Sequence, residues 1–289
     1  MQIILISGLS GSGKSIVLKV LEDAEYFAVD NLPVALLPDL VTHLRGAKCT
    51  RLAVAVDMRA GSGLADLPKQ IEYVRAIEPD TRLIFLNARD DTLIARFSET
   101  RRRHPLATGE RTVSEAIQCE RDTLAPIAEL GHNIDTSDLH PHTLRAWVKD
   151  FIEADPAAGL ALMFQSFGFK FGIPLDADLV FDVRCLPNPH YDPQLRPFTG
   201  RDQPVIDFLS TVPDVVRMRE DIRRFVSDWL PGYRRDNRSY LTVALGCTGG
   251  QHRSVYLTEW LAREFADQAP VMLRHRSIDT QHEPLVQLP

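Results

Sequence analysis

An apolar run at the start of the chain leads directly into a glycine-rich loop. Residues 2–7 read QIILIS and residues 8–15 read GLSGSGKS. The loop has the Gly-x-x-x-x-Gly-Lys-Ser pattern of a P-loop, and a periodic, helix-like segment follows at 15–23. A strand, this loop and a helix in succession form the arrangement in which the pattern binds phosphates. The start of the chain therefore predicts an α/β fold of the P-loop NTPase type, with a kinase-like parallel sheet.

Each part of this loop has a chemical role. Glycines let the backbone curl so that successive N–H groups point at phosphates, Lys14 supplies a positive charge, and the Ser15 hydroxyl can coordinate Mg²⁺. The N-terminus of the following helix adds a partial positive charge. A glycine-rich turn with a chance Lys-Ser pair is the alternative, which the flanking strand and helix disfavour. We expect a nucleoside triphosphate at Gly8, Leu9, Ser10, Gly11, Ser12, Gly13, Lys14 and Ser15.

Two further segments of the first half suit a phosphate site. Asp57 ends the apolar run 51–57, where a carboxylate can face the metal ion in a Walker-B-like role; an ordinary turn aspartate is the alternative. Arg101, Arg102 and Arg103 end a helix-like segment, and such a cluster can close over phosphates as a lid. A solvated basic helix end explains the three arginines equally well.

Short buried runs alternate with helix-like segments throughout the first half. Residues 51–57 and 82–87 are such runs, and Thr112 and Glu115 have the spacing of a capping box at a helix start. This alternation predicts a parallel sheet covered on both faces. Residues 154–159 (ADPAAG) lose the helical pattern, so we place a domain boundary there and expect domains at 1–153 and 154–289.

The second half is less regular but repeats a strand, a loop and a helix near its end. Pro-rich residues 186–201 predict a long loop. We expect strands at 160–171, 179–184 and 240–246, and helices at 213–230 and 254–267. The second domain is therefore also predicted to be α/β.

Residues 246–254 (GCTGGQHRS) form a second candidate anion loop. Cys247 and Arg253 have the Cys-x₅-Arg spacing of a phosphatase loop, and a cysteine at a helix N-terminus beside an arginine has a lowered pKa. A catalytic thiol, a non-catalytic pocket for a phosphorylated ligand and an inert turn all remain open. Binding is favoured, because catalysis also needs a general acid, for which Asp192 is the candidate. His190, in the same loop as Asp192, is a second contact to such a ligand.

Composition narrows the function classes. The net charge of −6 argues against a chain-wide basic coat for nucleic acid. No apolar run reaches the ~18 residues that a membrane span needs, and residues 1–7 lack the flanks of a signal peptide. We therefore expect a cytoplasmic protein without membrane contact. The four cysteines predict neither disulfides nor a zinc site, because Cys49, Cys119, Cys185 and Cys247 are widely spaced.

Four segments together carry a family resemblance. They are GLSGSGKS at 8–15, SETRRRHPL at 98–106, SFGFKFGIPLDADLVFDVRCLPNPHYDP at 166–193 and GCTGGQHRSV at 246–255. With these segments the chain resembles the RapZ/YvcJ family of bacterial P-loop nucleotide-binding proteins. That family includes the adapter that presents small regulatory RNAs to an endoribonuclease. The P-loop is shared with many families, whereas the two C-terminal segments are far more specific.

The resemblance implies ligands and site residues for both halves. In the first half it implies ATP binding at 8–15, weak ATPase and GTPase activity, and a GTP-associated stretch at Asp57, Met58, Arg59 and Ala60. The role of Asp57 thus stays open between metal coordination and base recognition. In the second half it implies that glucosamine-6-phosphate is sensed in a pocket lined by His190, Cys247, Thr248, Gly249 and Arg253.

The resemblance also implies partners, namely a small regulatory RNA and an endoribonuclease, and we expect a homo-oligomer. One departure concerns the RNA: adapter members end in a lysine-rich tail, whereas the residues after Arg276 (SIDTQHEPLVQLP) include no Lys or Arg. Each lost contact to a single-strand phosphate would reduce the salt slope by about 0.7.

Our leading hypothesis is a two-ligand regulator whose nucleotide, ATP or GTP with Mg²⁺, is turned over slowly, because the sequence shows no obvious acceptor site or catalytic base. The rivals are a small-molecule kinase, a Cys247-dependent phosphatase and a pure RNA-binding protein.

Overall fold

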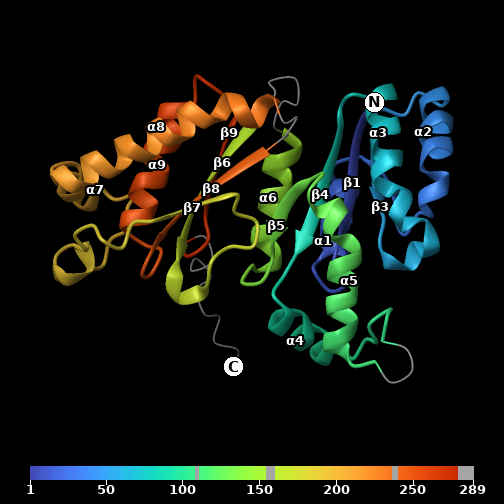
Figure 1. Cartoon of the computed structure of the whole chain (residues 1–289), viewed down its shortest axis with the longest axis horizontal. Helices are drawn as coiled ribbons and strands as arrows, with labels where there is room; N and C mark the ends of the chain where they lie inside the picture. The colour runs from blue at the N-terminus through green and yellow to red at the C-terminus, as the bar shows by residue number, and fades with distance from the viewer. Residues whose placement is uncertain (108–110, 154–159, 236–239, 279–289) are drawn as a thin grey trace. The chain divides into compact units, whose positions relative to one another are not determined.

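The computed structural model describes residues 1–107, 111–153, 160–235 and 240–278. The chain divides into two compact units, Met1–Glu153 and Ala154–Pro289, each with its own parallel sheet (Figure 1). The boundary segment that we expect at 154–159 lies outside the described residues. Within the described ranges, none of the helices combines the length and apolar character that crossing a bilayer requires.

The sheet of the first unit has five parallel strands in the order β2-β3-β1-β4-β5. Their bounds are β1 Gln2–Gly8, β2 Phe27–Val29, β3 Arg51–Ala55, β4 Thr81–Asn87 and β5 His132–Asp135. The apolar run at the start of the chain becomes the central strand, and Ile3 to Ile6 are almost completely buried. Such a run suits a parallel strand that is covered on both faces. The carboxyl ends of all five strands meet at one edge.

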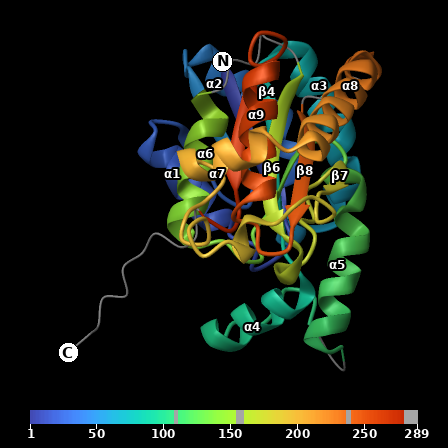
Figure 2. The same cartoon turned by 90° about the vertical axis from the view of Figure 1, so that its left-hand side faces the viewer.

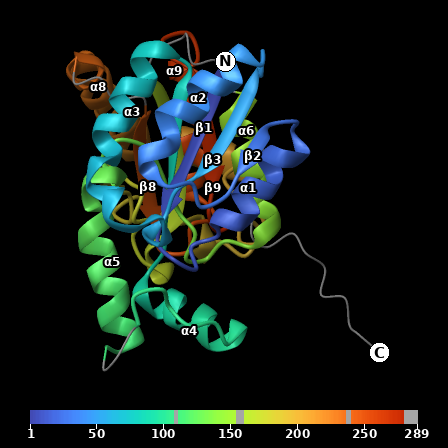
Figure 3. The same cartoon turned by 90° about the vertical axis from the view of Figure 1, so that its right-hand side faces the viewer.

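Helices cover both faces of this sheet, as the sequence predicts. Their bounds are α1 Lys14–Asp23, α2 Leu37–Gly46, α3 Leu67–Ile77, α4 Asp90–Thr100, α5 Val113–Ala128 and α6 Pro141–Glu153. Ile3 and Leu5 of β1 share a core with side chains of α2, α3 and α5, whereas α1 and α6 contact each other (Figure 3). The capping box at Thr112 is confirmed, because its side chain and that of Glu115 each accept the other's backbone N–H.

The second unit has four parallel strands in the order β7-β8-β6-β9, with α7, α8 and α9 against the sheet (Figure 2). Its core includes Phe164, Leu245, Leu257 and Phe265, all fully buried. The elements are β6 Ala161–Gly168, β7 Leu179–Asp182, α7 Gln203–Ser210, α8 Pro213–Arg235, β8 Tyr240–Cys247, α9 Arg253–Phe265 and β9 Val271–His275. Two of them, α7 and β9, were not foreseen from the sequence.

The strand that we expect at 160–171 is shorter in the structure. It ends at Gly168, and Phe169–Phe171 form a 3₁₀ turn instead. The reason is close packing: a Cβ at Gly168 would lie 2.7 Å from the backbone of Gly249. The Lys170 N–H donates to the Thr248 carbonyl at 3.3 Å, so the chain bends across the loop that follows β8.

Candidate functional site

The P-loop lies between β1 and α1, at the carboxyl edge of the first sheet. β1 ends at Gly8, whose φ is +138° and whose added Cβ would lie 2.2 Å from the Leu86 carbonyl oxygen. Gly13 is left-handed at the start of α1, with φ +106°. Both positions require glycine, because L side chains strain such backbone. The loop thus has the backbone curl that a phosphate cradle needs.

Lys14 and Asp57 meet at this loop. The Lys14 Nζ donates to the Gly8 carbonyl at 2.7 Å and to the Leu9 carbonyl at 3.1 Å, and it lies 3.8 Å from Asp57 Oδ2. Asp57 is only 4% exposed and follows β3, the neighbour of β1. Asp57 is 43 positions beyond Lys14 in the sequence. The two side chains nevertheless meet, because neighbouring parallel strands bring their carboxyl ends together.

The donor set at this edge suits magnesium. The Ser15 hydroxyl is on the exposed first turn of α1, and the Asp57 carboxylate is close to the neighbouring lysine. Hydroxyl and carboxylate oxygens are ligands that Mg²⁺ prefers, usually together with nucleotide phosphates. In the described ranges, no three His, Cys, Asp or Glu side chains are grouped so that they could hold a metal ion by themselves.

The stretch 57–60 enters a 3₁₀ helix, Met58–Asp66. Met58 packs partly buried against the core of the first unit. The side chains of Arg59 and Ala60 lie outside what the structure describes. The structure therefore brings Asp57 to the P-loop, and base recognition by 58–60 stays a prediction.

Three side chains hold the P-loop from outside, and the sequence analysis missed all of them. Glu120 of α5 accepts hydrogen bonds from Ser10, Arg96 of α4 donates to the Gly11 carbonyl at 3.1 Å, and the Thr136 hydroxyl donates to the Ser12 carbonyl at 3.0 Å. A signal for Glu120 was available. It is a charged residue in the otherwise apolar core stripe of α5, formed by Ala116, Ile117, Leu124 and Ile127.

The three arginines proposed as a lid follow α4 directly. Arg101, Arg102 and Arg103 are all exposed, and Arg101 has a left-handed φ of +51°. The next residue, His104, is buried and contacts Glu120. The exposed arginines are thus attached to a buried anchor, an arrangement that the sequence did not indicate.

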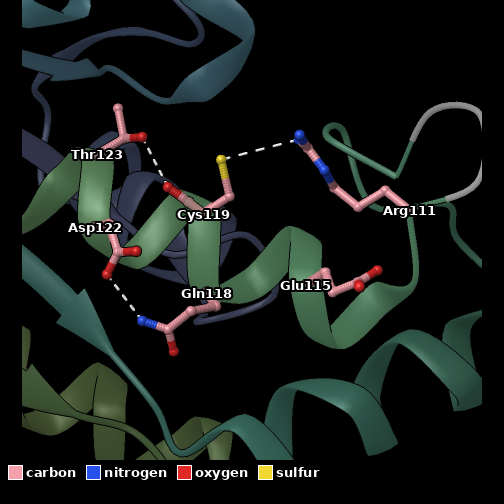
Figure 4. A pocket seen from close by; sticks show the side chains of 6 residues that line it. All are labelled: Arg111, Glu115, Gln118, Cys119, Asp122 and Thr123. Atoms are coloured by element: carbon pink, nitrogen blue, oxygen red, sulfur yellow. Dashed lines mark hydrogen bonds between the residues drawn. The ribbon is translucent and has the colours of Figure 1, made fainter.

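A groove of about 730 Å³ lies elsewhere on this unit, on the exposed side of α5 (Figure 4). Arg111 reaches across it, with Nη1 3.9 Å from Cys119 Sγ, and Gln118 bonds Asp122. None of the predicted site residues lines it. The groove therefore plays no part in the candidate sites.

The second candidate loop lies between β8 and α9. Gly250 is left-handed at φ +70°, and an added Cβ would lie 2.2 Å from Ser277 Oγ, so only glycine fits. The Cys247 thiol is 3% exposed, accepts the Gly250 N–H at 3.2 Å and lies 3.2 Å from Ser254 Oγ. Burial raises the pKa of Cys247, but the hydrogen bonds from Ser254 and Gly250 and the Arg253 charge outweigh it and lower the pKa.

Arg253 is a buried clamp within this loop. It is 3% exposed, and its Nη1 donates to the carbonyls of Arg184 at 2.7 Å and Leu186 at 2.8 Å. Its Nη2 is 3.4 Å from the Thr248 hydroxyl. Its Nε is buried without a hydrogen-bond partner among the described residues. The clamp joins the segment after β7 to the loop after β8.

His252 is a site residue that the sequence analysis missed, although it precedes Arg253. It is 5% exposed, and its Nε2 has no hydrogen-bond partner in the part of the chain that the structure describes. Its ring lies 6.3 Å from that of exposed His190. Burial and the nearby His190 lower the pKa of His252. The structure thus places His190 beside this loop, together with exposed Thr248 and half-buried Gly249.

Asp192, the candidate general acid, has a local role. Its Oδ1 accepts the Gln194 N–H at 2.8 Å, the pattern of an Asx turn. This bond accounts for the residue as a turn former. In the segment after β7, Arg184 bonds Asp182, and its Cζ lies 3.9 Å from the Phe169 ring centre.

Comparison with known proteins agrees with this two-unit architecture. The model of the RapZ-like N-terminal domain matches residues 1–156, and that of the RapZ C-terminal domain matches residues 160–279. The chain belongs to the RapZ family. RapZ-family relatives include the nucleotide-binding protein azo0399 of Azoarcus sp. strain BH72, which is 73% identical over 277 residues, 96% of this chain and 95% of that protein. The nucleotide-binding protein AZOSEA20610 of Aromatoleum aromaticum is 70% identical over the same shares.

Among solved structures, shikimate kinase from Acinetobacter baumannii is similar to this RapZ-family chain with a TM-score of 0.40 and 16% identity. The match covers 53% of this chain and 93% of the kinase. Deoxyadenosine kinase from M. mycoides gives 0.31 and 15%, over 52% of this chain and 98% of that one.

Proposed function

We propose that this chain is a two-ligand regulator. Its first unit binds ATP or GTP with Mg²⁺ at Gly8–Ser15 and hydrolyses it slowly, and its second unit binds a phosphorylated amino sugar at the Cys247–Arg253 loop. One observation carries the first part: Lys14 and Asp57, from different strand ends, lie 3.8 Å apart at a left-handed glycine loop. Close relatives that are called nucleotide-binding proteins support it.

The arrangement of the first unit suits binding more than rapid turnover. Lys14 would hold the terminal phosphates, and Ser15 and Asp57 would hold Mg²⁺, which supplies charge neutralisation when bound. Asp57 is paired with Lys14, and Glu120 already accepts bonds from Ser10 and His104. Both carboxylates are already engaged with other side chains, which supports slow hydrolysis. A nucleotide held in this way acts as a conformational signal.

The second loop combines donors for a phosphate with an acceptor for a sugar. The unpaired Arg253 Nε and the N-terminus of α9 favour an anion. His252, with its lowered pKa, is neutral at pH 7, and its Nε2 can accept a hydrogen bond from a hydroxyl or ammonium group. This pairing supports glucosamine-6-phosphate as the ligand, with His190 and Thr248 at the exposed side of the pocket.

A phosphatase is the second candidate, and the lowered pKa of Cys247 favours it. Two observations favour binding instead: the thiol is almost fully buried, and Asp192 bonds within its own turn. The variant Cys247→Ser separates the two. If it abolished hydrolysis of an aryl phosphate while keeping affinity for glucosamine-6-phosphate, the phosphatase would replace the sensor.

We further propose a small regulatory RNA and an endoribonuclease as partners of a homo-oligomer. The last arginines of the described chain do not supply the RNA surface, because Arg274 and Arg276 are buried and Arg276 lies 3.9 Å from Asp176. Gel shifts of the full chain with structured small RNAs at increasing salt test this part. An absence of any shift at low salt would remove RNA from the proposal.

Calorimetry of the full chain tests the two pockets. We expect Lys14→Ala to lose binding of ATP and GTP but to keep binding of glucosamine-6-phosphate. We expect Arg253→Ala to lose binding of glucosamine-6-phosphate but to keep that of ATP and GTP. Loss of both ligand classes in either variant would contradict separate pockets. Rapid transfer of phosphate from ATP to a small acceptor would instead establish a kinase.

A further inference from the structure

A buried carboxylate is bonded directly to the P-loop. Glu120 of α5 is completely buried, and both of its oxygens bond to Ser10. Oε2 accepts the Ser10 backbone N–H at 2.8 Å, and Oε1 accepts the Ser10 hydroxyl at 2.8 Å. A carboxylate that takes both donors of one residue fixes its backbone and its side chain together, through charge-assisted bonds. Ser10 itself is almost fully buried.

His104 supplies the third donor to the same carboxylate. Its Nε2 lies 3.0 Å from Glu120 Oε2, and the Leu106 N–H donates to its Nδ1 at 3.1 Å. Because Nδ1 accepts a hydrogen bond, Nε2 carries the hydrogen and donates to Glu120. A buried carboxylate is costly unless its oxygens are satisfied. Three donors satisfy the oxygens of this one, namely the Ser10 N–H, the Ser10 hydroxyl and the His104 Nε2–H.

An acidic side chain beside an anion-binding loop needs a reason, because a carboxylate repels phosphate. We attribute its presence to the direction in which it holds a loop amide. The Ser10 N–H is drawn to Glu120, the Leu9 N–H bonds Leu86 and the Ser12 N–H bonds the Leu9 carbonyl. The amides at the start of α1 then form the phosphate-facing part of the loop. Glu120 thus keeps the Ser10 amide turned away from a ligand.

The same carboxylate ties the loop to the arginine segment. His104 directly follows Arg101–Arg103, and its ring centre lies 5.0 Å from that of Phe97 on α4. Helices α4 and α5 contact each other in the first unit. The arginines are exposed, whereas His104, the next residue in the chain, is buried. The histidine therefore anchors the exposed arginine segment to the interior of the unit.

We propose that Glu120 and His104 are positioning residues that form a latch. The latch holds the P-loop in its phosphate-binding curvature and fixes the Arg101–Arg103 segment to it. This inference rests on the proposed nucleotide binding. The latch acts on the site of the phosphates and not on that of the base. Loss of the latch should therefore weaken the binding of ATP, GTP and inorganic tripolyphosphate by the same factor.

Calorimetry of the full chain with these three ligands tests the latch. We expect Glu120→Gln to weaken each of them about tenfold, which corresponds to about 1.4 kcal/mol. The matched control is Asp122→Asn, which removes an equal charge from the exposed side of α5 and should change nothing. If Glu120→Gln does not fold, Ser10→Ala removes one bond of the latch, and we expect a loss of about threefold.

His104 variants give a readout that mere destabilisation would not move. His104→Gln places an amide N–H where Nε2 was and should keep most of the affinity, whereas His104→Leu should lose it. Arg102→Ala should weaken tripolyphosphate binding in the wild type but have no further effect in His104→Leu. Independent effects of these two changes would overturn the link to the arginine segment.

The outcomes separate the latch from the function on which it rests. If the wild type binds no nucleotide, or if Lys14→Ala binds it unchanged, the proposed function fails and the latch with it. If Lys14→Ala loses binding but Glu120→Gln melts earlier and binds all three ligands within twofold of wild type, the latch alone is overturned. A loss for only one nucleotide would also overturn it, because that pattern indicates base recognition.

Discussion

Replacing Arg253 by alanine should destabilise the second unit strongly, apart from any effect on its ligand. The guanidinium donates to two backbone carbonyls, at 2.7 and 2.8 Å, and it is 3% exposed. Charge-assisted bonds contribute about 1.5–3 kcal/mol each, and water reaches the partly exposed Arg184 carbonyl once the clamp is gone, so we expect a loss of about 3–4 kcal/mol. This corresponds to roughly 10–15 °C in the melting temperature of the unit.

Scanning calorimetry measures the shift, and hydrogen exchange should locate the loosened amides in β8 and α9. Arg263→Ala is the matched control: it removes an arginine from the same helix, but its side chain is exposed and lies 3.8 Å from Glu259. Such a surface pair contributes about 0–1 kcal/mol. If Arg253→Ala cost no more than this control, or loosened only the first unit, the clamp argument would be refuted.

Three further predictions address single positions. Glu259→Gln should destabilise the chain near pH 6 but not near pH 2. The bond from His275 lowers the pKa of Glu259 to about 2, so its contribution is present above the ordinary value of 4.5 and is lost as pH falls toward 2; urea unfolding at several pH values checks this, and a constant difference would contradict it. Gly8→Ala should cost at least about 3 kcal/mol, because it combines strained backbone with a 2.2 Å contact to Leu86, and thermal melting would reveal a tolerated substitution. Asp57→Asn should weaken ATP and GTP equally and only when Mg²⁺ is present; a changed ATP-to-GTP ratio in titrations with EDTA would assign Asp57 to the base instead.

The local sequence was sufficient wherever one short pattern decides the structure. The run 2–7 followed by glycines allows a buried strand and a phosphate loop and little else, and the Thr112 capping box begins a helix as predicted. The short strand β2 and the last strand β9 were missed. β9 contains buried Arg274 and His275, so its pattern does not resemble an apolar strand. Packing inside the unit, rather than propensity, makes this segment a strand.

The candidate sites were predictable in their loops but not in their supports. Lys14 and Arg253 follow from motif spacing, whereas Glu120 and Arg96 contact the P-loop from positions 80–110 residues away. Contacts between distant residues depend on how α4 and α5 pack, and no spacing rule indicates them. A charged residue in the apolar stripe of a helix is the kind of local contradiction that marks functional positions. Glu120 is such a residue.

The two candidate anion loops differ in how their cationic side chain is held. Both place glycine backbone and a helix N-terminus at the carboxyl edge of a parallel sheet, which favours anions. In the first loop the cation is Lys14, whose Nζ bonds the carbonyls of the loop itself and can exchange them for phosphate oxygens. In the second the cation is Arg253, whose Nη1 is committed to the carbonyls of another segment. A ligand of the first loop therefore has to displace the hydrogen bonds between Lys14 and the loop carbonyls. A ligand of the second loop meets an Arg253 side chain that its bonds to another segment already hold in position. On this argument, the Lys14 side chain should move when a ligand binds the first loop, whose backbone the latch already holds, whereas the Arg253 clamp should stay in place.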